Sequence, residues 1–443
     1  MVWSAPKVES WSLSSGVRVL FVERHDLPIV SVRVVSPLGA GDLPGLRPGT
    51  AAITGAMLEQ GAGKRTALEI DDDYQALGVA HGTWCDWDSA GARVKVLASK
   101  LAPALDILAD VVLRPTLSQE EFDRLRKRWL ASLQAEKNSP VAVEQNAIAA
   151  ALYGRGHPYG HSIRGVAADV EPLTRADVQR AYGLLFAPRS TTIVVAGDVT
   201  RGDVASLLEA RFGAWKGQPA IRTPVPPAPP PPKTAGKVVL VDVPGAAQSQ
   251  TYVAQPGVPF ASKDRVALQV MNLILGGMFS SRINLELREA KAYTYGARSR
   301  FSLRHGAGPF SGGGAIFVEH TADAAKELVA QVARMRDEPV SAEELGDAKE
   351  NAELALPSRF ESVDDVTGAL QDLAVYDLPL DEYQTRAARV DAVTAADVQR
   401  VAKLWLRPKD LRVVVAGDRS KIEKDLSALG TVEVRDPYGD PVK

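Results

Sequence analysis

The stretch 192–198, Thr-Ile-Val-Val-Ala-Gly-Asp, recurs 220 positions later as residues 412–418, Arg-Val-Val-Val-Ala-Gly-Asp. The same offset relates residues 173–180, Leu-Thr-Arg-Ala-Asp-Val-Gln-Arg, to residues 393–400, Val-Thr-Ala-Ala-Asp-Val-Gln-Arg. Two matches at one offset indicate an internal repeat, in which each half of the chain folds as one unit. The threonine before an acidic first turn predicts the start of a helix in each copy, and the valine-rich stretch predicts a strand.

A proline-rich stretch separates the two copies. Residues 223–232 read Thr-Pro-Val-Pro-Pro-Ala-Pro-Pro-Pro-Pro, and proline lacks the amide donor that helices and central strands require. We therefore expect a stiff extended linker over 221–235, a first half over 1–220 and a second half over 236–443. Each half mixes short strands with helices without a regular β-α-β alternation, which indicates the α+β class.

The composition excludes several function classes. The chain has 443 residues, of which 45% are hydrophobic and 24% are charged, as in an ordinary globular protein of two or three domains. A net charge of −2 gives no electrostatic reason to expect nucleic acid or an anionic membrane as partner. No apolar run approaches the roughly 18 residues of a membrane span. The compartment stays open: the absence of a visible signal peptide favours the cytoplasm, whereas a mature form would suit the periplasm.

Residues 276–298 carry the motif that points to a family. They read Gly-Gly-Met-Phe-Ser-Ser-Arg-Ile-Asn-Leu-Glu-Leu-Arg-Glu-Ala-Lys-Ala-Tyr-Thr-Tyr-Gly-Ala-Arg. This run resembles the stretch S-S-R-L-x-x-x-[IVL]-R-E-x-x-G-L-A-Y-S of the pitrilysin/insulinase (inverzincin) metallopeptidases. The resemblance covers essentially the whole chain. It implies two homologous α+β halves, each a mixed or antiparallel sheet with helices on one face, that form half of a clamshell chamber.

The resemblance also implies a role for two side chains in this run. In the family, an arginine and a tyrosine seven residues apart donate hydrogen bonds to the substrate backbone beside the scissile bond, and the matching residues are Arg288 and Tyr295. A guanidinium and a phenol suit that task, because both can donate to a carbonyl oxygen that gains negative charge. Taken singly, Arg288 would be a solvated helix residue and Tyr295 an ordinary strand aromatic. The family glycine and leucine between them are Ala292 and Tyr293 here.

The zinc motif of the same family is degenerate in this chain. Residues 49–61, Gly-Thr-Ala-Ala-Ile-Thr-Gly-Ala-Met-Leu-Glu-Gln-Gly, resemble the helix that carries H-x-x-E-H, whose histidines share one zinc and whose glutamate activates the bound water. The matching positions are Ala52, Gly55 and Ala56, and the third ligand position, 76 residues beyond Ala56, is Ser132. A hydroxyl is a poor zinc ligand. We therefore expect no metal bound by this chain. The alternative interpretation is an ordinary core helix with no relation to the motif.

Other histidines and the single cysteine offer no replacement metal site. His157 and His161 are four residues apart, but Pro158 and Gly160 between them oppose the helix that would bring both rings to one face. We expect a structural or surface loop there. Cys85 is the only cysteine, so it forms neither an intrachain disulfide nor a zinc knuckle, and we expect a buried inert thiol.

Three functions follow from these observations. The first is a non-catalytic subunit of a heterodimeric zinc peptidase, in which a partner of similar size carries H-x-x-E-H and the zinc, and this chain supplies Arg288 and Tyr295 to a peptide substrate. The second is a metal-free peptide-binding or scaffold protein of the same fold. The third is a peptidase with an unrecognised site, which no Gly-x-Ser-x-Gly elbow or Cys/His signature supports. We expect a chain that is inactive alone and binds no cofactor.

Overall fold

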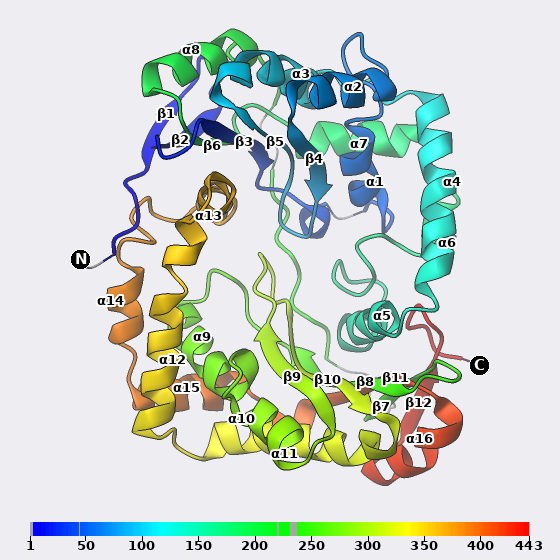
Figure 1. The fold of residues 1–443 in the computed structure, drawn as a ribbon. Coiled ribbons are helices and arrows are strands. Elements are labelled where there is room, and N and C mark those ends of the chain that lie inside the picture. The colour runs from blue at the N-terminus through cyan, green and yellow to red at the C-terminus, as the bar shows by residue number, and fades with distance from the viewer. Residues whose placement is uncertain (1–2, 44, 219–220, 231–236, 443) are drawn as a thin grey trace. The chain divides into compact units, whose positions relative to one another are not determined.

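The computed structural model describes residues 3–43, 45–218, 221–230 and 237–442, and the chain divides into two compact units. Each unit contains one six-stranded sheet in its described residues (Figure 1). The first unit comprises Met1–Ala131, Ile163–Pro224 and Ala355–Arg386. The second unit comprises Ser132–Ser162, Val225–Leu354 and Ala387–Lys443.

The sheet of the first unit has the strand order β1-β2-β6-β3-β5-β4. Its pairs are antiparallel except β2 with β6, which makes the sheet mixed. The edge strand β4 pairs only with β5 within the described part of the chain. The strands are β1 (Glu9–Ser12), β2 (Arg18–Glu23), β3 (Ile29–Ser36), β4 (Ala80–Cys85), β5 (Ala90–Leu97) and β6 (Thr192–Gly197).

Both faces of this sheet are buried, each by a different set of helices (Figure 1). Alternate strand residues such as Val19 and Phe21 pack with α3 and α8, whereas Leu20 and Val22 between them pack with α13. The helices are α1 (Thr50–Met57), α2 (Ala67–Leu77), α3 (Leu101–Leu113), α6 (Ala167–Val170), α7 (Arg175–Leu185), α8 (Arg201–Phe212) and α13 (Val363–Val375), with 3-10 turns η1 (Ala40–Asp42), η2 (Ala98–Lys100) and η6 (Pro357–Phe360).

The sheet of the second unit repeats this design, with the strand order β12-β7-β11-β8-β10-β9. The strand β11 (Arg412–Gly417) runs parallel to β7 and antiparallel to β8, just as β6 runs parallel to β2 and antiparallel to β3. The two copies of the sequence repeat therefore occupy equivalent central positions. The other strands are β7 (Val238–Asp242), β8 (Gln248–Pro256), β9 (Thr294–Phe301), β10 (Pro309–Phe317) and β12 (Val432–Arg435).

The main core of the second unit lies between this sheet and α9, α11 and α15, and α5 contacts strands β7, β8 and β11. Figure 1 shows α5 and α11 on opposite sides of this sheet. The helices are α5 (Pro140–Tyr153), α9 (Arg265–Asn272), α10 (Arg282–Asn284), α11 (Thr321–Asp337), α12 (Ala342–Leu354), α15 (Ala395–Trp405) and α16 (Arg419–Leu426), with 3-10 or π-helical turns η3 (Leu273–Gly277), η4 (Leu285–Ala290), η5 (Val318–His320), η7 (Pro408–Asp410) and η8 (Ser427–Leu429). Two helices, α4 (Gln119–Glu136) and α14 (Arg386–Asp391), pass from one unit into the other.

The predicted fold class is confirmed: both halves of the sequence form open mixed sheets with packed helices. The structure adds an exchange of helices that the sequence did not predict. The helix α13 belongs to the second half of the sequence but packs on the first sheet, and α5 belongs to the first half but packs on the second sheet. The predicted linker over 221–235 lies partly outside the described residues, and residues 221–230 form no helix or strand.

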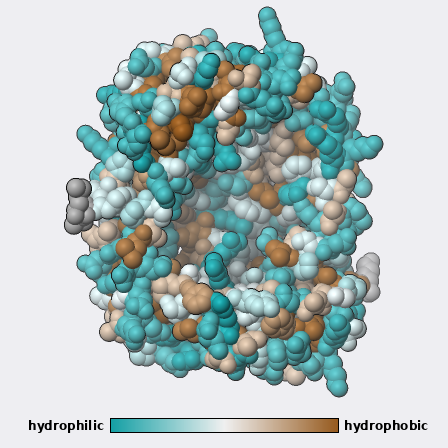
Figure 2. Space-filling model, in the orientation of Figure 1, coloured by the Kyte–Doolittle hydropathy of each residue, from teal (hydrophilic) through white to brown (hydrophobic). Residues whose placement is uncertain are grey.

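One stretch, Arg265–Ala290, is long and apolar enough to cross a membrane by length and composition alone. Half of its most apolar 18-residue window is buried inside the structure, and π-helical turns interrupt it. Buried core helices have the same composition, so this stretch is weak support for a span. The face in view in Figure 2 is mostly hydrophilic, with apolar residues in separate groups.

Candidate functional site

The degenerate zinc motif lies on α1, a helix packed against the edge strand β4. Gly49 precedes the helix with a φ of 87°, which favours glycine. A Cβ atom at this position would also lie 2.6 Å from the carbonyl oxygen of Arg164. Ala52 and Ala56 are partly exposed on one side of α1, whereas Gly55 is buried. These three residues offer no donor atom to a metal, so the chain's own residues do not fit a zinc site at this helix.

Gly55 brings α1 into close contact with β4. A Cβ atom at this position would lie 3.1 Å from the backbone nitrogen and the Cβ of Cys85, and 3.1 Å from the carbonyl carbon of Trp84. Contacts this short with strand backbone leave little room for any side chain. At the position that matches the family glutamate, a side chain would therefore require the neighbouring strand to shift by a few tenths of an ångström.

A pocket of about 520 Å³, here called the α1–β4 pocket, opens beside the two alanines. It is lined by Ala52, Ala56 and Glu59 of the α1 segment, residues 82–85 of β4, Trp129 of α4, and residues 163–164. The indole nitrogen of Trp129 donates to the carbonyl oxygen of Arg164 at 3.0 Å, and the Arg164 guanidinium lies 4.6 Å from the Trp129 ring centroid. Trp129 carries no motif of its own in the sequence, and only its position three residues before Ser132 could have indicated it.

The ionisable groups near this pocket have partners. The Nδ1 atom of His81 lies 2.9 Å from Oε1 of Glu59, and its Nε2 atom lies 3.7 Å from the Asp71 carboxylate. The hydrogen bond with Glu59 raises the pKa of His81. Burial raises the pKa of the Cys85 thiol, which favours its protonated, unreactive form. The residue is partly exposed, whereas the sequence led us to expect a buried one.

Ser132 lies on α4, in the part of this helix that belongs to the second unit, whereas Ala52, Gly55 and Ala56 belong to the first. Its side chain is partly buried. The preceding turn of α4 contributes Trp129 to the α1–β4 pocket. The third ligand position thus carries a hydroxyl, and the α4 residue that reaches the pocket is an indole.

Arg288 lies on the π-helical turn η4 in the second unit. Its guanidinium carbon sits 4.4 Å from the ring centroid of Phe279, a side chain that is 64% exposed. Its Nε atom lies 3.4 Å from the Glu289 carboxylate. A cation held over an aromatic ring can still donate to a ligand from those N–H groups that no carboxylate engages. Phe279 stands within the motif run 276–298, but the sequence alone did not indicate that its ring would support Arg288.

Tyr295 lies on β9, the edge strand that follows this turn, and is 80% exposed. The pairing of β9 with β10 shifts register between Gly314 and Ile316, and this bulge lies opposite Tyr295. The Tyr295 ring packs edge-on against Phe317 at 5.4 Å between ring centroids. No hydrogen bond to its hydroxyl is found within the described residues, which leaves the phenol available to an external acceptor.

The connection between Arg288 and Tyr295 is a tight turn. The amide of Ala292 donates to the Arg288 carbonyl at 3.1 Å, and the amide of Tyr293 donates to the Leu287 carbonyl at 2.8 Å. Ala292 adopts a φ of 52°, the left-handed region that glycine fills without strain. This is the position at which the family motif has glycine. The turn places the end of η4 directly beside the start of β9.

Neither of the other histidine candidates forms a metal site in the described residues. The Nδ1 atom of His157 accepts from the Tyr159 amide at 3.0 Å, and its Nε2 atom donates to the Pro226 carbonyl at 2.9 Å. Both ring nitrogens are therefore engaged, and burial lowers the pKa of His157. His161 lies in the same loop and contacts the Ser162 carbonyl. The predicted structural loop is consistent with this arrangement.

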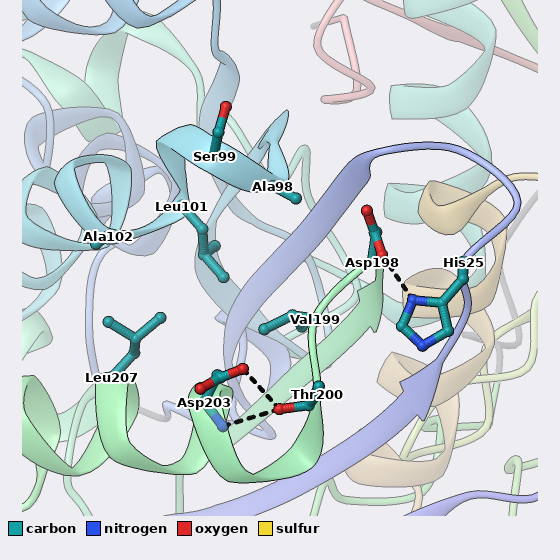
Figure 3. A pocket seen from close by; sticks show the side chains of 10 residues that line it. All are labelled: His25, Ala98, Ser99, Leu101, Ala102, Asp198, Val199, Thr200, Asp203 and Leu207. Carbon is teal, nitrogen blue, oxygen red and sulfur yellow. Dashed lines mark hydrogen bonds and ion pairs between the residues drawn. The ribbon is translucent and has the colours of Figure 1, made fainter.

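A second pocket, of about 340 Å³, lies in the first unit around His25 (Figure 3). The Nδ1 atom of His25 lies 2.6 Å from Oδ1 of Asp198, and its Nε2 atom lies 2.9 Å from Oε1 of Glu23. These two carboxylates raise the pKa of His25. Because both ring nitrogens are engaged, His25 has none left to activate a nucleophile or to bind a metal.

Comparison with known proteins agrees with this geometry. The family model described as "Insulinase (Peptidase family M16)" matches residues 18–165, and "Peptidase M16 inactive domain" matches residues 172–352. An uncharacterized zinc protease of Mycobacterium bovis is 25% identical over 427 residues, which cover 94% of this chain and 95% of that protein. The zinc protease PqqE of Helicobacter pylori is 24% identical over 379 residues, 84% of each chain.

Solved structures show the same fold over nearly the whole chain. The peptidase M16 inactive domain from Pseudomonas fluorescens superposes with a TM-score of 0.84 at 28% identity, covering 93% of this chain and 98% of that one. A protease from Helicobacter pylori has a TM-score of 0.84 at 22% identity, covering 93% and 100%. The sequence motifs, the two repeated sheets and these matches agree. The chain therefore belongs to the insulinase family of peptidases, family M16.

Proposed function

We propose that this chain is the non-catalytic subunit of a two-chain zinc peptidase. The observation that carries the proposal is the contrast between two sites of one family member. The positions of the zinc motif hold Ala52, Gly55 and Ala56, which offer no donor atom to a metal, while Arg288 is partly exposed and Tyr295 is exposed in their motif. Substrate-contacting groups on a chain without a metal centre can contribute to hydrolysis only when another chain supplies the zinc.

The environment of Arg288 and Tyr295 supports a hydrogen-bonding role. The ring of Phe279 supports the guanidinium of Arg288 from one face, and Phe317 packs against Tyr295. Each side chain thus has an aromatic neighbour that restricts its motion. Donors fixed in advance stabilise a carbonyl oxygen that becomes negative more effectively than mobile ones do.

The partner in this proposal is a family M16 chain of similar size with an intact H-x-x-E-H motif. A zinc ion held by such a partner would supply the activated water for hydrolysis of a peptide bond. The residues of this chain would bind and orient the peptide, and Arg288 and Tyr295 would donate to the carbonyl oxygen next to the bond that is cleaved.

The test is turnover by the assembled complex. We expect Tyr295→Phe, which deletes one hydroxyl, to lower kcat on the order of 100-fold, because loss of one such donor typically costs that much. Arg298→Ala is the control, since Arg298 is another exposed side chain of β9 and should leave kcat near wild type. The purified chain alone should contain no stoichiometric zinc and cleave no peptide. Wild-type turnover by the Tyr295→Phe complex would refute the role in trans.

A metal-free peptide-binding protein is the second candidate. The unpaired edge of β4 and the adjacent α1–β4 pocket favour it, because together they could hold a peptide without cleaving it. The two candidates differ in one measurement. If no H-x-x-E-H chain associates with this one during co-expression and size exclusion, the binding protein is the better interpretation.

A further inference from the structure

Three basic side chains lie together on one face of the sheet in the first unit. Arg33 of β3 stands directly opposite Arg93 of β5 in the register of these antiparallel strands, and Lys95 follows two residues later on β5. Residues that are opposite each other, or two apart on one strand, share a face of the sheet. It is the face on which α13 packs, because Arg33 donates to the carbonyl oxygen of Asp364 on α13 at 2.8 Å. These three residues are here called the β3–β5 basic cluster.

The cluster carries more positive charge than its neighbours compensate. The carboxylate of Asp364 lies 2.7 Å from the Lys95 ammonium and accepts from the Ser31 hydroxyl at 2.8 Å. The guanidinium of Arg33 donates to neutral oxygens, those of the Gln371 side chain and of a backbone carbonyl. Three cations and one carboxylate leave a net charge of +2 at this place.

The next carboxylates along α13 are engaged elsewhere. Asp365 accepts from Ser362 at the start of the helix, at 3.0 Å from its amide. Asp372 accepts from the Tyr383 hydroxyl at 3.1 Å and pairs with Arg359. Neither forms a hydrogen bond or an ion pair with the basic cluster within the described residues.

Arg93 is the member of the cluster that has no partner. Its side chain is exposed and forms no hydrogen bond or ion pair in the part of the chain that the structure describes. Like charges directly opposite each other destabilise a sheet. Burial lowers the pKa of Arg33, and the charge of Arg93 lowers it further. An arginine at position 93 therefore opposes folding electrostatically, and an anionic ligand would relieve that repulsion.

The space beside Arg93 is open to a ligand. The helix α13 packs on β2, β3 and β6. On the other side of β5, the residue of β4 opposite Arg93 is Gly82, and the nearest atom to a Cβ placed there would be Nε of Arg93, at 3.9 Å. The arginine thus extends over a strand position without a side chain. A guanidinium presents paired N–H groups whose geometry matches the two oxygens of a carboxylate.

We propose that Arg93 and the β3–β5 basic cluster bind a carboxylate side chain of a peptide, so that the first unit selects peptides that contain glutamate or aspartate. Three positive charges in one small group match one or two carboxylates, and the chain as a whole, with a net charge of −2, does not attract the long phosphate backbone of a nucleic acid. The proposal rests on the proposed function in taking a peptide as the ligand, and it adds the chemical class of that peptide. The cluster lies on the face of the sheet opposite to α1, since Ala51 of α1 belongs to the other core together with Val94 of β5.

The experiment measures binding of a peptide to the full chain without any partner. The probe is the hexapeptide Ala-Thr-Glu-Glu-Thr-Ala with blocked termini and an uncharged dye, followed by fluorescence anisotropy at low ionic strength, where charges are least screened. A second peptide has glutamine in place of both glutamates. We expect the glutamate peptide to bind at least fivefold more tightly than the glutamine peptide. Equal affinities, or no binding of the glutamate peptide, would overturn the proposal.

Substitution of Arg93 tests the location. Arg93→Gln should weaken binding of the glutamate peptide at least fivefold and bring its affinity to that of the glutamine peptide. Arg180→Gln is the matched control, because Arg180 is an exposed arginine of α7 and its loss changes the net charge of the chain by the same amount. This control should keep the fivefold preference. A preference that survives Arg93→Gln, or that disappears in Arg180→Gln, would contradict the proposal.

Urea denaturation separates ligand binding from a structural role of Arg93. Arg93→Gln removes the like charge opposite Arg33, so its unfolding midpoint should equal or exceed that of the wild type. A lower midpoint would show that Arg93 holds the sheet together, and it would count against a ligand-binding arginine.

These assays need neither zinc nor a second chain. Their failure would therefore leave the role of Arg288 and Tyr295 in trans standing. Conversely, wild-type turnover by the Tyr295→Phe complex would remove that role and leave the preference for glutamate peptides as it was measured.

Discussion

Replacement of Gly55 by alanine tests whether the former zinc helix is now packed too closely on β4 to carry a side chain. In an open helix the change would stabilise the protein by about 0.5–1 kcal/mol, because glycine costs that much relative to alanine. At Gly55 the new Cβ would lie 3.1 Å from backbone atoms of Trp84 and Cys85. Overpacking of this kind typically costs about 1–3 kcal/mol, so we expect a net loss of about 1 kcal/mol.

The assay is equilibrium urea denaturation, with Gly346→Ala as the matched control. Gly346 is an exposed residue of α12, and a Cβ there would meet no atom within 4 Å. The control should therefore gain about 0.5–1 kcal/mol. If Gly55→Ala is stabilised as much as Gly346→Ala, then α1 shifts away from β4 at little cost. The inference that α1 packs too closely on β4 to accommodate a side chain at position 55 would then be wrong.

Two further substitutions test the second unit. Burial raises the pKa of Glu144 from 4.5 to about 8, so this group makes the folded state lose stability as the pH rises from 4.5 to 8. Glu144→Gln should thus stabilise the protein by about 3 kcal/mol at pH 7 and have almost no effect at pH 4.5. Urea denaturation at these two pH values measures the difference, and equal effects on stability would contradict the burial argument. Ala292→Gly should gain about 1 kcal/mol by relieving a φ of 52°, and a loss of stability would refute the strain.

The sequence predicted those parts of the fold that depend on local pattern. The repeated stretches became β6 and β11, at equivalent places in two mixed sheets. The threonines Thr174 and Thr394 cap α7 and α15 through the same hydrogen bonds to Asp177 and Asp397. These features could be predicted because capping and strand burial are determined by residues within a few positions of each other.

The exchange of α5 and α13 between the units could not be predicted in this way. Each helix is amphipathic or apolar in sequence, and nothing in that pattern states which of two similar sheets it covers. The choice depends on contacts such as those of Leu370 and Leu373 with Leu20 and Val194, far apart in the chain. Tertiary packing therefore decides what periodicity leaves open.

At the site, the sequence led to the prediction that zinc ligands are absent, and it did not indicate the pocket beside those positions. The absent ligands could be identified because H-x-x-E-H has a fixed spacing on one helix. The pocket beside them combines Trp129 from α4 with residues 82–85 from β4, which are far apart in the sequence. The kind of residue at the motif positions is informative in itself. Ala52 and Ala56 suit the helix α1, and Gly55 lets it pack on β4, so the helix and its contact with the edge strand form without any metal-donor side chain at these three positions. That combination is what a subunit needs if it holds a peptide for a partner to cleave.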